Sequence, residues 1–435
     1  MTIDDRGTVN LHTHTHTTRP NEPSPNWSAY GLLRRKTSDG SFLPVVDGLR
    51  FLAISWVFLY HSAGFVAHKA YGHTEWPWGA GIDIERPSIE TFFVQFASLG
   101  FFGVQLFFVI SGFVLALPFA RARLNIDSRA KVPTLSAYLL RRVTRLEPPY
   151  IFNLLFVAGL SVLLYKMPLA DVLSSAGASL VYLHGDLYSG SPLNPVFWTL
   201  EIEVRFYLLA PLLALVFCIK SSLVRRILLV MAIIGGCILQ LRLPSHLAHG
   251  NLLLNQVQYF LVGFLLADLY TSRPSIHLKA YTWDLLGLTG WTTLVIWLIN
   301  AVDLSKPTHG ALIHIGNCIA IFFAYCGVLF GKRLGNVLAW SPLFLLGGMC
   351  YTIYLWHYLI IGTFGRLLGA PWSAGSLGTS ILINTIVLSI FSLPIWVVLF
   401  VTLERPFMDK TWPSRFGHSL VRRIRSLRND SAAKE

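Results

Sequence analysis

The chain has 435 residues, of which 54% are hydrophobic and only 13% are charged, and its mean hydropathy is +0.55. Soluble domains contain about 25% charged residues, so this composition excludes an ordinary water-soluble enzyme and predicts a membrane protein. The net charge of +13 is compatible with a nucleic-acid partner or with basic loops on one membrane face. The basic residues lie between apolar blocks, which favours membrane loops and no nucleic acid.

The N-terminal segment 1–40 is polar, rich in Pro, Thr and Asn, and lacks the apolar core of a signal peptide. We expect it to be a disordered tail. His12, His14 and His16 could bind a metal ion weakly, but a flexible tail is the simpler explanation and we expect no metal. The five cysteines all lie in apolar blocks and predict neither a disulfide nor a metal centre.

The membrane domain is predicted to span 41–408, followed by a basic cytoplasmic tail at 409–435. Apolar blocks within this domain have about the length needed to cross a bilayer. They predict an all-α polytopic protein with about ten transmembrane helices, at 44–66, 98–120, 147–165, 202–219, 227–243, 255–270, 282–300, 310–330, 342–365 and 380–402.

Basic residues are distributed unevenly between the two sides of this ten-helix arrangement. Cytoplasmic loops of membrane proteins carry an excess of Lys and Arg, so both termini are predicted to be cytoplasmic. The other side has few basic residues, namely Lys69, Arg86, Lys166, Lys306 and Arg366. The richer side includes Arg34, Arg35, Lys36, Arg121, Arg123, Arg129, Lys131, Arg141, Arg142, Arg145, Lys220, Arg225, Arg226, Arg273, Lys279, Lys332 and Arg333, together with the C-terminal tail.

The segment 169–183 is apolar enough to form a helix of its own. A full span here would place Lys220, Arg225 and Arg226 outside and would invert every later loop. We therefore predict a re-entrant or interfacial helix within an outer loop of about 166–201. Such a helix could cap a site from the non-cytoplasmic side.

The first apolar block carries Asp47, Arg50 and His61. Arg50 and His61 are eleven residues apart, so they share one helix face at a separation of about 16 Å, and Asp47 lies on the same side. Ionisable groups inside a membrane helix are costly and mark functional sites. The alternative is that Arg50 extends to the cytoplasmic surface and that His61 only fills the core.

The stretch YLLRRVTRLEPPY places Arg141 or Arg142 on one helix face with Arg145. Two guanidinium groups at this spacing could bind a phosphate group. The alternative is ordinary cytoplasmic charge that contacts anionic lipid headgroups.

Three further stretches carry candidate residues. In NPVFWTLEIEVRFYLLAPLL, Glu203 could orient a histidine, accept a hydrogen bond from a substrate hydroxyl or pair with Arg205. In MCYTIYLWHYLI, Tyr354 and His357 lie on one aromatic helix face. An aromatic belt at the membrane interface would explain the tyrosine, but it explains the histidine less well. In TLERPFMDK, Glu404 and Arg405 predict a structural ion pair at a helix end. Small residues in GFFGVQLFFVISGFVLA, namely Gly103, Ser111 and Gly112, predict close helix packing.

These stretches resemble the acyltransferase-3 family of bacterial integral-membrane O-acyltransferases. The resemblance rests on Asp47–Arg50 followed by His61 at R-x10-H spacing, and then on FFGVQLFFVISGF, RRVTRLEPPY, FWTLEIEVRFYL, YTIYLWH and ERP, in that order. It covers about 44–408. It implies a multi-pass protein of the bacterial inner membrane that moves an acyl group, often acetyl, from cytoplasmic acyl-coenzyme A to a hydroxyl of a cell-envelope glycan, a lipid-linked sugar or a secreted metabolite.

The resemblance also implies roles for single residues. Arg50 and His61 take the positions of the family's essential pair, and we expect Asp47, three residues before Arg50, to hold the Arg50 side chain. Glu203 matches the family's glutamate, while Thr199 replaces the usual serine and Glu147 adds an acid beside the arginine motif. Arg142 and Arg145 match the family's R-x-x-R pair, which implies donor binding. From the residues themselves we also predict donor binding by Arg141, and substrate binding by Tyr207, Trp198, His357 and Tyr354.

The chemistry expected from this set is acyl transfer with His61 as general base or as the first acyl acceptor. Imidazole suits both roles because its ordinary pKa is about 6.5. The segment after Met408 is too short for the fused hydrolase-like domain of some relatives, so the membrane domain is expected to complete the transfer. The alternatives are a transporter of a small anion or a proton-coupled solute, and a non-enzymatic flippase or scaffold.

Overall fold

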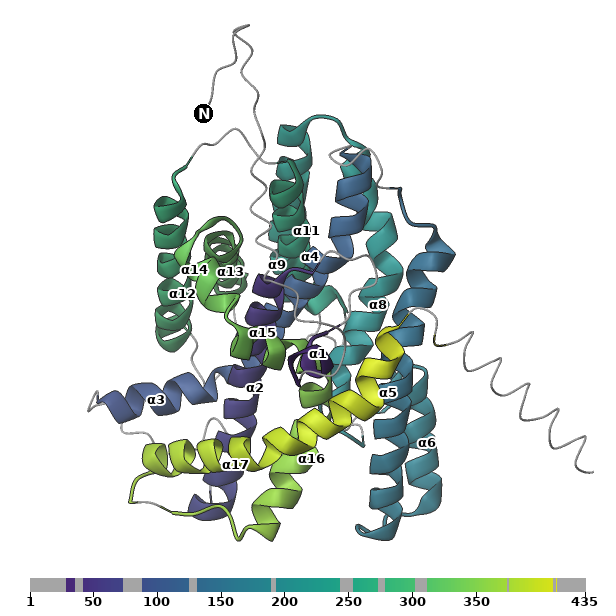
Figure 1. Ribbon diagram of the computed structural model, residues 1–435, viewed down its shortest axis with the longest axis vertical. Helices are drawn as coiled ribbons and strands as arrows, with labels where there is room; N and C mark the ends of the chain where they lie inside the picture. Colours follow the sequence, from purple (N-terminus) through teal and green to yellow (C-terminus); the bar gives the residue numbers. More distant parts are fainter. Residues whose placement is uncertain are drawn as a thin grey trace, which may run out of the picture.

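The computed structural model describes residues 29–35, 42–72, 88–124, 131–188, 193–242, 253–272, 278–301, 311–373, 375–409 and 412. Every element in these ranges is a helix (Figure 1), which confirms the all-α fold class. Most of the predicted tails, at 1–28, 36–40 and 413–435, lies outside the described residues. The exception at the N-terminus is Ala29–Leu33, which forms the short helix α1 and receives a hydrogen bond from Arg405 at the Gly31 carbonyl oxygen.

The helices fall into long and short groups. The long helices are α2 (Pro44–Tyr71), α4 (Gly103–Arg123), α5 (Leu135–Leu163), α9 (Ser222–Arg242), α12 (Ala280–Ala301), α13 (Ala311–Phe330) and α17 (Leu377–Leu399). The shorter ones are α3 (Ile89–Ser98), α6 (Leu169–Leu180), α7 (His184–Leu187), α8 (Phe197–Leu213), α11 (Val257–Ser272), α14 (Arg333–Leu338), α15 (Ser341–Gly348) and α16 (Cys350–Leu367). Single turns lie at η1 (Gly100–Phe102), η2 (Ala214–Cys218), η3 (Leu253–Asn255), η4 (Phe400–Glu404) and η5 (Arg405–Met408).

Seven helices within the described ranges are long and apolar enough to cross a membrane. An eighth candidate is the pair α15 and α16, which is bent by 72°. All ten apolar blocks of the sequence fall on helices, but α8 and α11 have only 17 and 16 residues. The count of about ten spans and the cytoplasmic termini stay predictions.

The segment 169–183 forms α6, which has 12 residues and is therefore too short to span a bilayer. It packs beside α5, where the Tyr150 hydroxyl donates a hydrogen bond to the Ser179 carbonyl oxygen at 2.7 Å (Figure 1). A short helix at this place agrees with the predicted re-entrant or interfacial segment.

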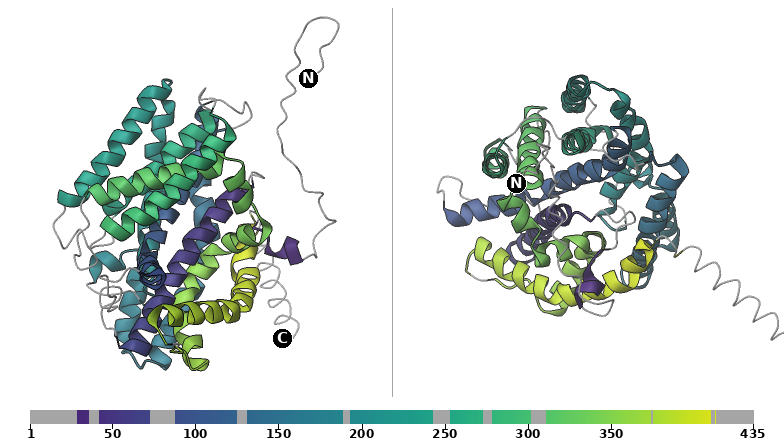
Figure 2. Two further views of the ribbon diagram at one scale, coloured as in Figure 1. Left: turned by 90° about the vertical axis from the view of Figure 1, so that its left-hand side faces the viewer. Right: turned by 45° about the horizontal axis from the view of Figure 1, so that its top comes forward.

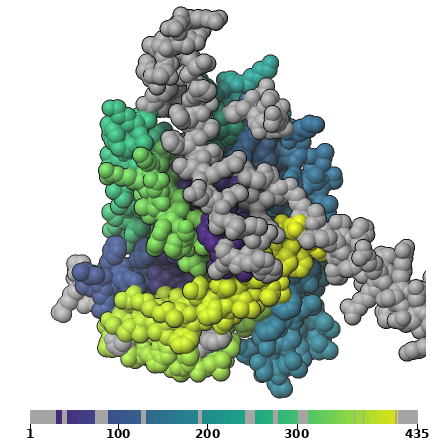
Figure 3. All heavy atoms as spheres, in the orientation of Figure 1, coloured from purple at the N-terminus to yellow at the C-terminus, as the bar shows by residue number. Residues whose placement is uncertain are grey.

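Helix α2 lies in the interior of the bundle, where it packs against α4, α15, α16 and α17. Figure 2 shows it surrounded by the other helices. Helix α17 crosses the lower part of the molecule and covers one face of α2 and α16 (Figure 3). The residues that α2 carries are therefore placed between several helices, as a site inside a membrane domain requires.

Helices α4 and α11 approach each other at glycines. A Cβ atom at Gly112 would collide with the Phe260 carbonyl oxygen, and one at Gly263 would collide with the backbone around Val109. Small residues let membrane helices come into backbone contact. The predicted packing role is thus confirmed for Gly112.

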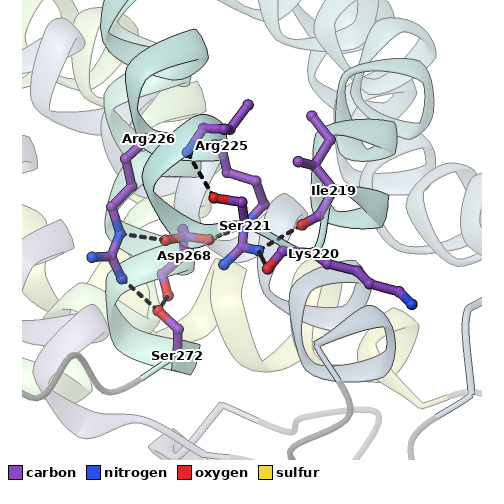
Figure 4. Close-up of polar contacts among 8 residues, drawn as sticks. Ile219, Lys220, Ser221, Arg225, Arg226, Asp268 and Ser272 are labelled. Atoms are coloured by element: carbon purple, nitrogen blue, oxygen red, sulfur yellow. Dashed lines mark hydrogen bonds and ion pairs between the residues drawn. The ribbon is translucent and has the colours of Figure 1, made fainter.

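A buried ion cluster joins α9 to α11 (Figure 4). Asp268 accepts hydrogen bonds from Arg225 Nε at 2.6 Å and from Arg226 Nε at 2.8 Å. Arg225 also donates to the Ile219 carbonyl oxygen, and Arg226 donates to the Ser272 hydroxyl. Since both carboxylate oxygens of Asp268 are bonded to guanidinium groups, we interpret the cluster as structural: it holds α9 against α11.

Candidate active site

The first turns of α2 hold a buried ion pair. The Asp47 carboxylate has no exposed surface and accepts hydrogen bonds from Arg50 Nη1 at 2.5 Å and from Arg35 Nε at 3.2 Å. Burial, and next the Arg50 charge, lower the pKa of Arg35 to about 10, although Asp47 acts in the opposite direction. Both guanidinium groups are therefore charged at neutral pH and held in fixed positions.

These arginines line a cavity that we call the arginine cavity, of about 110 Å³. Its walls come from α2, α4, α5, α8, α15 and α16, together with Arg35 and Glu404. Its charged lining consists of Arg35, Arg50, Arg142, Arg145, Glu203 and Glu404. The polar and aromatic lining consists of Ser111, Thr199, Tyr207, Cys350, Tyr351 and Tyr354.

The arginine pair of α5 reaches the cavity, as the spacing predicts. Arg142 lies with its guanidinium carbon 5.6 Å from the Tyr138 ring centroid and 5.8 Å from that of Tyr207. The Arg145 Nε atom is buried and has no hydrogen-bond partner among the described residues. Arg141, in contrast, is exposed, bonds the Ala137 carbonyl oxygen and does not line the cavity.

Glu203 lies in the same cavity and accepts a hydrogen bond from the Ser111 hydroxyl at 2.7 Å. It is not bonded to either histidine within the described residues. Glu147, the extra acid beside the arginine motif, accepts from the Tyr182 hydroxyl at 2.9 Å and does not line the cavity. The acid therefore does not face the space between Arg142 and Arg145.

His61 forms a pair with His357. His357 Nδ1 lies 2.8 Å from the Tyr354 carbonyl oxygen and 3.2 Å from that of Ile353. Carbonyl oxygens only accept, so in neutral His357 the proton is on Nδ1, and Nε2 is an acceptor. His61 Nδ1 lies 3.1 Å from this Nε2 and 3.0 Å from the Val57 carbonyl oxygen, so it is the donor. Neutral His61 thus has an unprotonated Nε2, with no hydrogen bond to the described residues.

His61 lines a second, larger cavity of about 680 Å³, which we call the histidine cavity. It is formed by the second halves of α2 and α16, by the end of α5 and by residues that precede α8. The sequence placed Arg50 and His61 on one helix face. The structure shows that they line different cavities, because the two cavities lie at successive levels along α2.

The remaining predicted substrate residues are divided between these places. Tyr207 and Tyr354 line the arginine cavity, and the Tyr354 hydroxyl lies 2.6 Å from the Thr199 hydroxyl oxygen. His357 is fully buried and lines neither cavity, since it lies behind His61. Trp198 is half-buried against the core and also lines neither cavity.

Two charged residues that line the arginine cavity, Arg35 and Glu404, were not predicted from the sequence as site residues. Arg35 lies in the segment predicted as a tail, and nothing in its local pattern indicates the contact with Asp47. Glu404 accepts hydrogen bonds from the Thr352 amide at 3.0 Å and from the Thr352 hydroxyl at 2.6 Å. The predicted Glu404–Arg405 ion pair is wrong, because Arg405 donates instead to the Gly31 carbonyl oxygen. The ERP motif therefore identified Glu404 as a notable residue, but it did not indicate that Glu404 lines the cavity.

Among the described residues, no group of three or more His, Cys, Asp or Glu side chains could hold a metal ion. The cysteines are free thiols, four of them within helices of the bundle and Cys218 at the end of η2. The described side chains at the site are thus imidazole, guanidinium, carboxylate and hydroxyl groups.

Comparison with known proteins decides the family. A family model described as an acyltransferase domain, that of the acyltransferase-3 family, matches residues 43–402. The chain belongs to the acyltransferase-3 family. The resemblance that the sequence motifs indicate is thereby confirmed.

Three curated relatives of this acyltransferase-3 chain have informative names. O-acetyltransferase OatA of Staphylococcus aureus is 24% identical over 343 residues, which is 74% of this chain and 51% of that protein. The putative peptidoglycan O-acetyltransferase YrhL of Bacillus subtilis is 26% identical and covers 75% and 50%. Peptidoglycan O-acetyltransferase OatA of Listeria monocytogenes is 25% identical and covers 74% and 49%. The chain thus spans about half the length of these relatives. No solved structure matches it.

Proposed function

We propose that the chain is a membrane O-acyltransferase that moves an acetyl or similar acyl group from acyl-coenzyme A to a hydroxyl group. The acceptor is a cell-envelope glycan, a lipid-linked sugar or a secreted metabolite, and the protein resides in the bacterial cell membrane. The family and the names of the relatives support acyl transfer. The observation that carries the proposal is the His61–His357 pair, because it leaves an unprotonated ring nitrogen beside a large cavity.

The arginine cavity is proposed to receive the donor. Small-molecule pockets usually measure about 300–1,000 Å³, so a cavity of 110 Å³ takes only part of the donor. We assign it to the acyl-pantetheine arm and a phosphate, while the nucleotide remains outside. Arg142 and the unpartnered Nε of Arg145 support this assignment, since guanidinium groups bind phosphate by charge-assisted hydrogen bonds.

The thioester end of the donor has to reach His61. Tyr354 separates the arginine cavity from the histidine pair. It lines that cavity, and its ring centroid lies 5.6 Å from that of His357. We propose that the Tyr354 side chain moves aside when the donor enters, which breaks its contact with the Thr199 hydroxyl. Arg50 and Asp47 remain at the donor end, about 16 Å and about 21 Å along α2 from His61, so we assign them to donor placement.

The proposed reaction is a direct transfer. His61 Nε2 takes the proton of the acceptor hydroxyl while the hydroxyl oxygen attacks the thioester carbonyl carbon. The carbon–sulfur bond breaks, and the coenzyme A thiolate leaves and recovers the proton. His357 accepts the hydrogen bond of His61 Nδ1 throughout and stabilises the imidazolium form. Glu203, with Ser111, is proposed to hold polar atoms of the donor arm.

The test uses the purified full chain in detergent with acetyl-coenzyme A, and it follows binding and release of the free thiol separately. Wild-type protein is expected to bind the donor saturably and to release thiol slowly, because in the absence of the acceptor a water molecule at His61 attacks the thioester carbonyl and takes the acyl group as acetate. His61→Gln should bind the donor but release thiol about 10²- to 10⁴-fold more slowly, and Arg142→Gln should bind the donor weakly. The exposed Arg141→Gln is the matched control and should resemble wild type.

Two results would contradict the proposal. One is thiol release that persists at the wild-type rate in His61→Gln, which would remove the assigned base. The other is that well-folded protein binds no acyl-coenzyme A, while liposomes containing it take up a labelled anion. That second result would favour the transporter alternative.

A further inference from the structure

The histidine cavity has a one-sided charge. Lys69 of α2 and Arg366 of α16 line it, as does His68, and no Asp or Glu among the described residues does so. The arginine cavity differs, because Glu203 and Glu404 line it together with its four arginines. The larger cavity is therefore positively charged without a compensating carboxylate in the part of the chain that the structure describes.

The two cations are also available to a ligand. Both side chains are exposed at the cavity, and neither Lys69 nor Arg366 has an ion pair or side-chain hydrogen bond with the described residues. An exposed lysine or arginine alone indicates little, since such residues are common at membrane surfaces. Here, however, the side of the bundle predicted to be poor in basic residues has two of its few cations at one cavity, beside the proposed base.

The positions of the cations relative to His61 are set by the helices. Lys69 follows His61 by eight residues, about 12 Å along α2, and Arg366 follows His357 by nine residues, about 14 Å along α16. Since His61 and His357 are in contact, both cations lie at a similar distance from the proposed base. A ligand that places a hydroxyl at His61 would thus place a group further along the same molecule between Lys69 and Arg366.

The rest of the lining suits a sugar. The rings of Tyr60 and Tyr358 lie edge-on to the His61 imidazole, with centroids 5.1 Å and 5.4 Å away. Aromatic rings offer apolar faces for packing and hydroxyl groups for hydrogen bonds. At 680 Å³, the cavity also falls within the usual range for small-molecule sites.

We propose that the acceptor is anionic: it carries a phosphate, diphosphate or carboxylate group that Lys69 and Arg366 bind, while its hydroxyl lies at His61. This inference rests on the proposed function and names the substrate class for the same site. A sugar linked through a diphosphate to a lipid and a glycan that carries a carboxylate share this chemistry. A neutral glycan or metabolite does not.

The experiment measures dissociation constants of three probes with the purified full chain in detergent: N-acetylglucosamine 1-phosphate, methyl glucuronide and neutral methyl glucoside. Wild type is expected to bind at least one anionic probe about tenfold or more tightly than the neutral one. In the double variant Lys69→Gln, Arg366→Gln this preference should disappear. Lys166→Gln is the matched control, because Lys166 is a nearby cation that does not line the cavity, and it should keep the preference.

The comparison of the two anionic probes distinguishes a phosphate-bearing from a carboxylate-bearing acceptor. Equal binding of all three probes would overturn the inference, as would a preference that persists in the double variant. Displacement of the anionic probes by phosphatidylglycerol vesicles but not by phosphatidylcholine vesicles would also overturn it, since the cations would then be lipid contacts.

Acceptor-independent thiol release separates this inference from the proposed function. The double variant should keep the wild-type dissociation constant for acetyl-coenzyme A, because Lys69 and Arg366 do not line the arginine cavity. Absence of an anion preference in wild-type protein that shows His61-dependent thiol release refutes only the anionic acceptor. Absence of thiol release in wild type refutes the proposed function itself.

Discussion

The proposed acid–base chemistry depends on two imidazole side chains, His61 and His357, from helices that are far apart in the sequence. The carbonyl oxygens of Tyr354 and Ile353 fix the proton of neutral His357 on Nδ1, and His357 in turn fixes that of His61. Both side chains lie in the bundle, and His357 is fully buried. Burial disfavours the charged form of an imidazole. The pair is thus arranged to present one neutral base.

Substitutions of the pair should have graded effects on thiol release. His61→Gln is expected to lower the rate about 10²- to 10⁴-fold, the usual contribution of a general base. His357→Leu removes only the group that fixes the His61 tautomer, so we expect a loss of about tenfold to 100-fold. His357→Gln offers a replacement acceptor and should recover part of the rate. A His357→Leu protein as active as wild type would show that the pairing has no role.

The arginine motif gives a second prediction at the same scale. Arg145→Gln should raise the KM for acetyl-coenzyme A about tenfold to 100-fold, because a charge-assisted hydrogen bond to phosphate is lost. Glu147→Gln, two residues away, should leave the KM unchanged, since Glu147 is bonded to Tyr182 and does not line the cavity. Steady-state kinetics of the two variants checks both. A fall in KM for Glu147→Gln would mean that this acid opposes donor binding after all.

Residue roles were predictable from motifs only in part. The spacing of Asp47 and Arg50 was sufficient to predict that they lie together on α2, and their contact is confirmed. The role of His357 could not be read in this way, because its partner lies 296 residues away and single-sequence patterns carry no information on such pairs. Arg35 was not predicted either. It lies 12 residues before its partner Asp47, and the segment between them has no helical pattern that would indicate the contact.

At the level of helices, the stability of the bundle depends on a few buried polar contacts between neighbouring helices. Asp268 neutralises Arg225, whose side chain is 2% exposed, and also binds Arg226, which is 24% exposed. Asp268→Asn should therefore destabilise the protein by about 3–5 kcal/mol, as expected when a buried cation loses its partner. Thermal unfolding in detergent measures this change.

The control for this prediction is Arg226→Gln, which leaves Arg225 paired and should have a much smaller effect. The variants should keep the wild-type KM for acetyl-coenzyme A while folded, because none of these residues lines the arginine cavity. A change in KM without a change in unfolding temperature would assign the cluster to the active site and contradict its structural role.

The helices themselves were predictable, because apolar length is a strong signal. The bend of 72° between α15 and α16 was not, since the block 342–365 is apolar throughout. That bend matters for the site: Gly348 and Cys350, on either side of it, line the arginine cavity. Gly347 and Gly348 stand at the break, and Gly347 packs so closely against α2 that a Cβ atom there would collide with the Asp47 carbonyl oxygen.

At the scale of the whole molecule, the two cavities lie at successive levels of the bundle, with the histidine pair and Tyr354 between them. Neither composition nor motif spacing reveals cavities, because they arise where several helices fail to fill space. This arrangement suits a reaction in which donor and acceptor arrive from opposite membrane faces. Basic residues of the predicted cytoplasmic loops lie near the arginine cavity, which agrees with a cytoplasmic donor.

The most direct test of this account is the sidedness of transfer in proteoliposomes of known protein orientation. Acetyl-coenzyme A labelled in the acetyl group is supplied only on the face near the arginine cavity, and the acceptor only on the other. Transfer across the bundle should yield labelled acceptor in the compartment opposite the donor, and His61→Gln should yield about 10²- to 10⁴-fold less of it. Product formed only when donor and acceptor share one compartment would contradict transfer across the bundle.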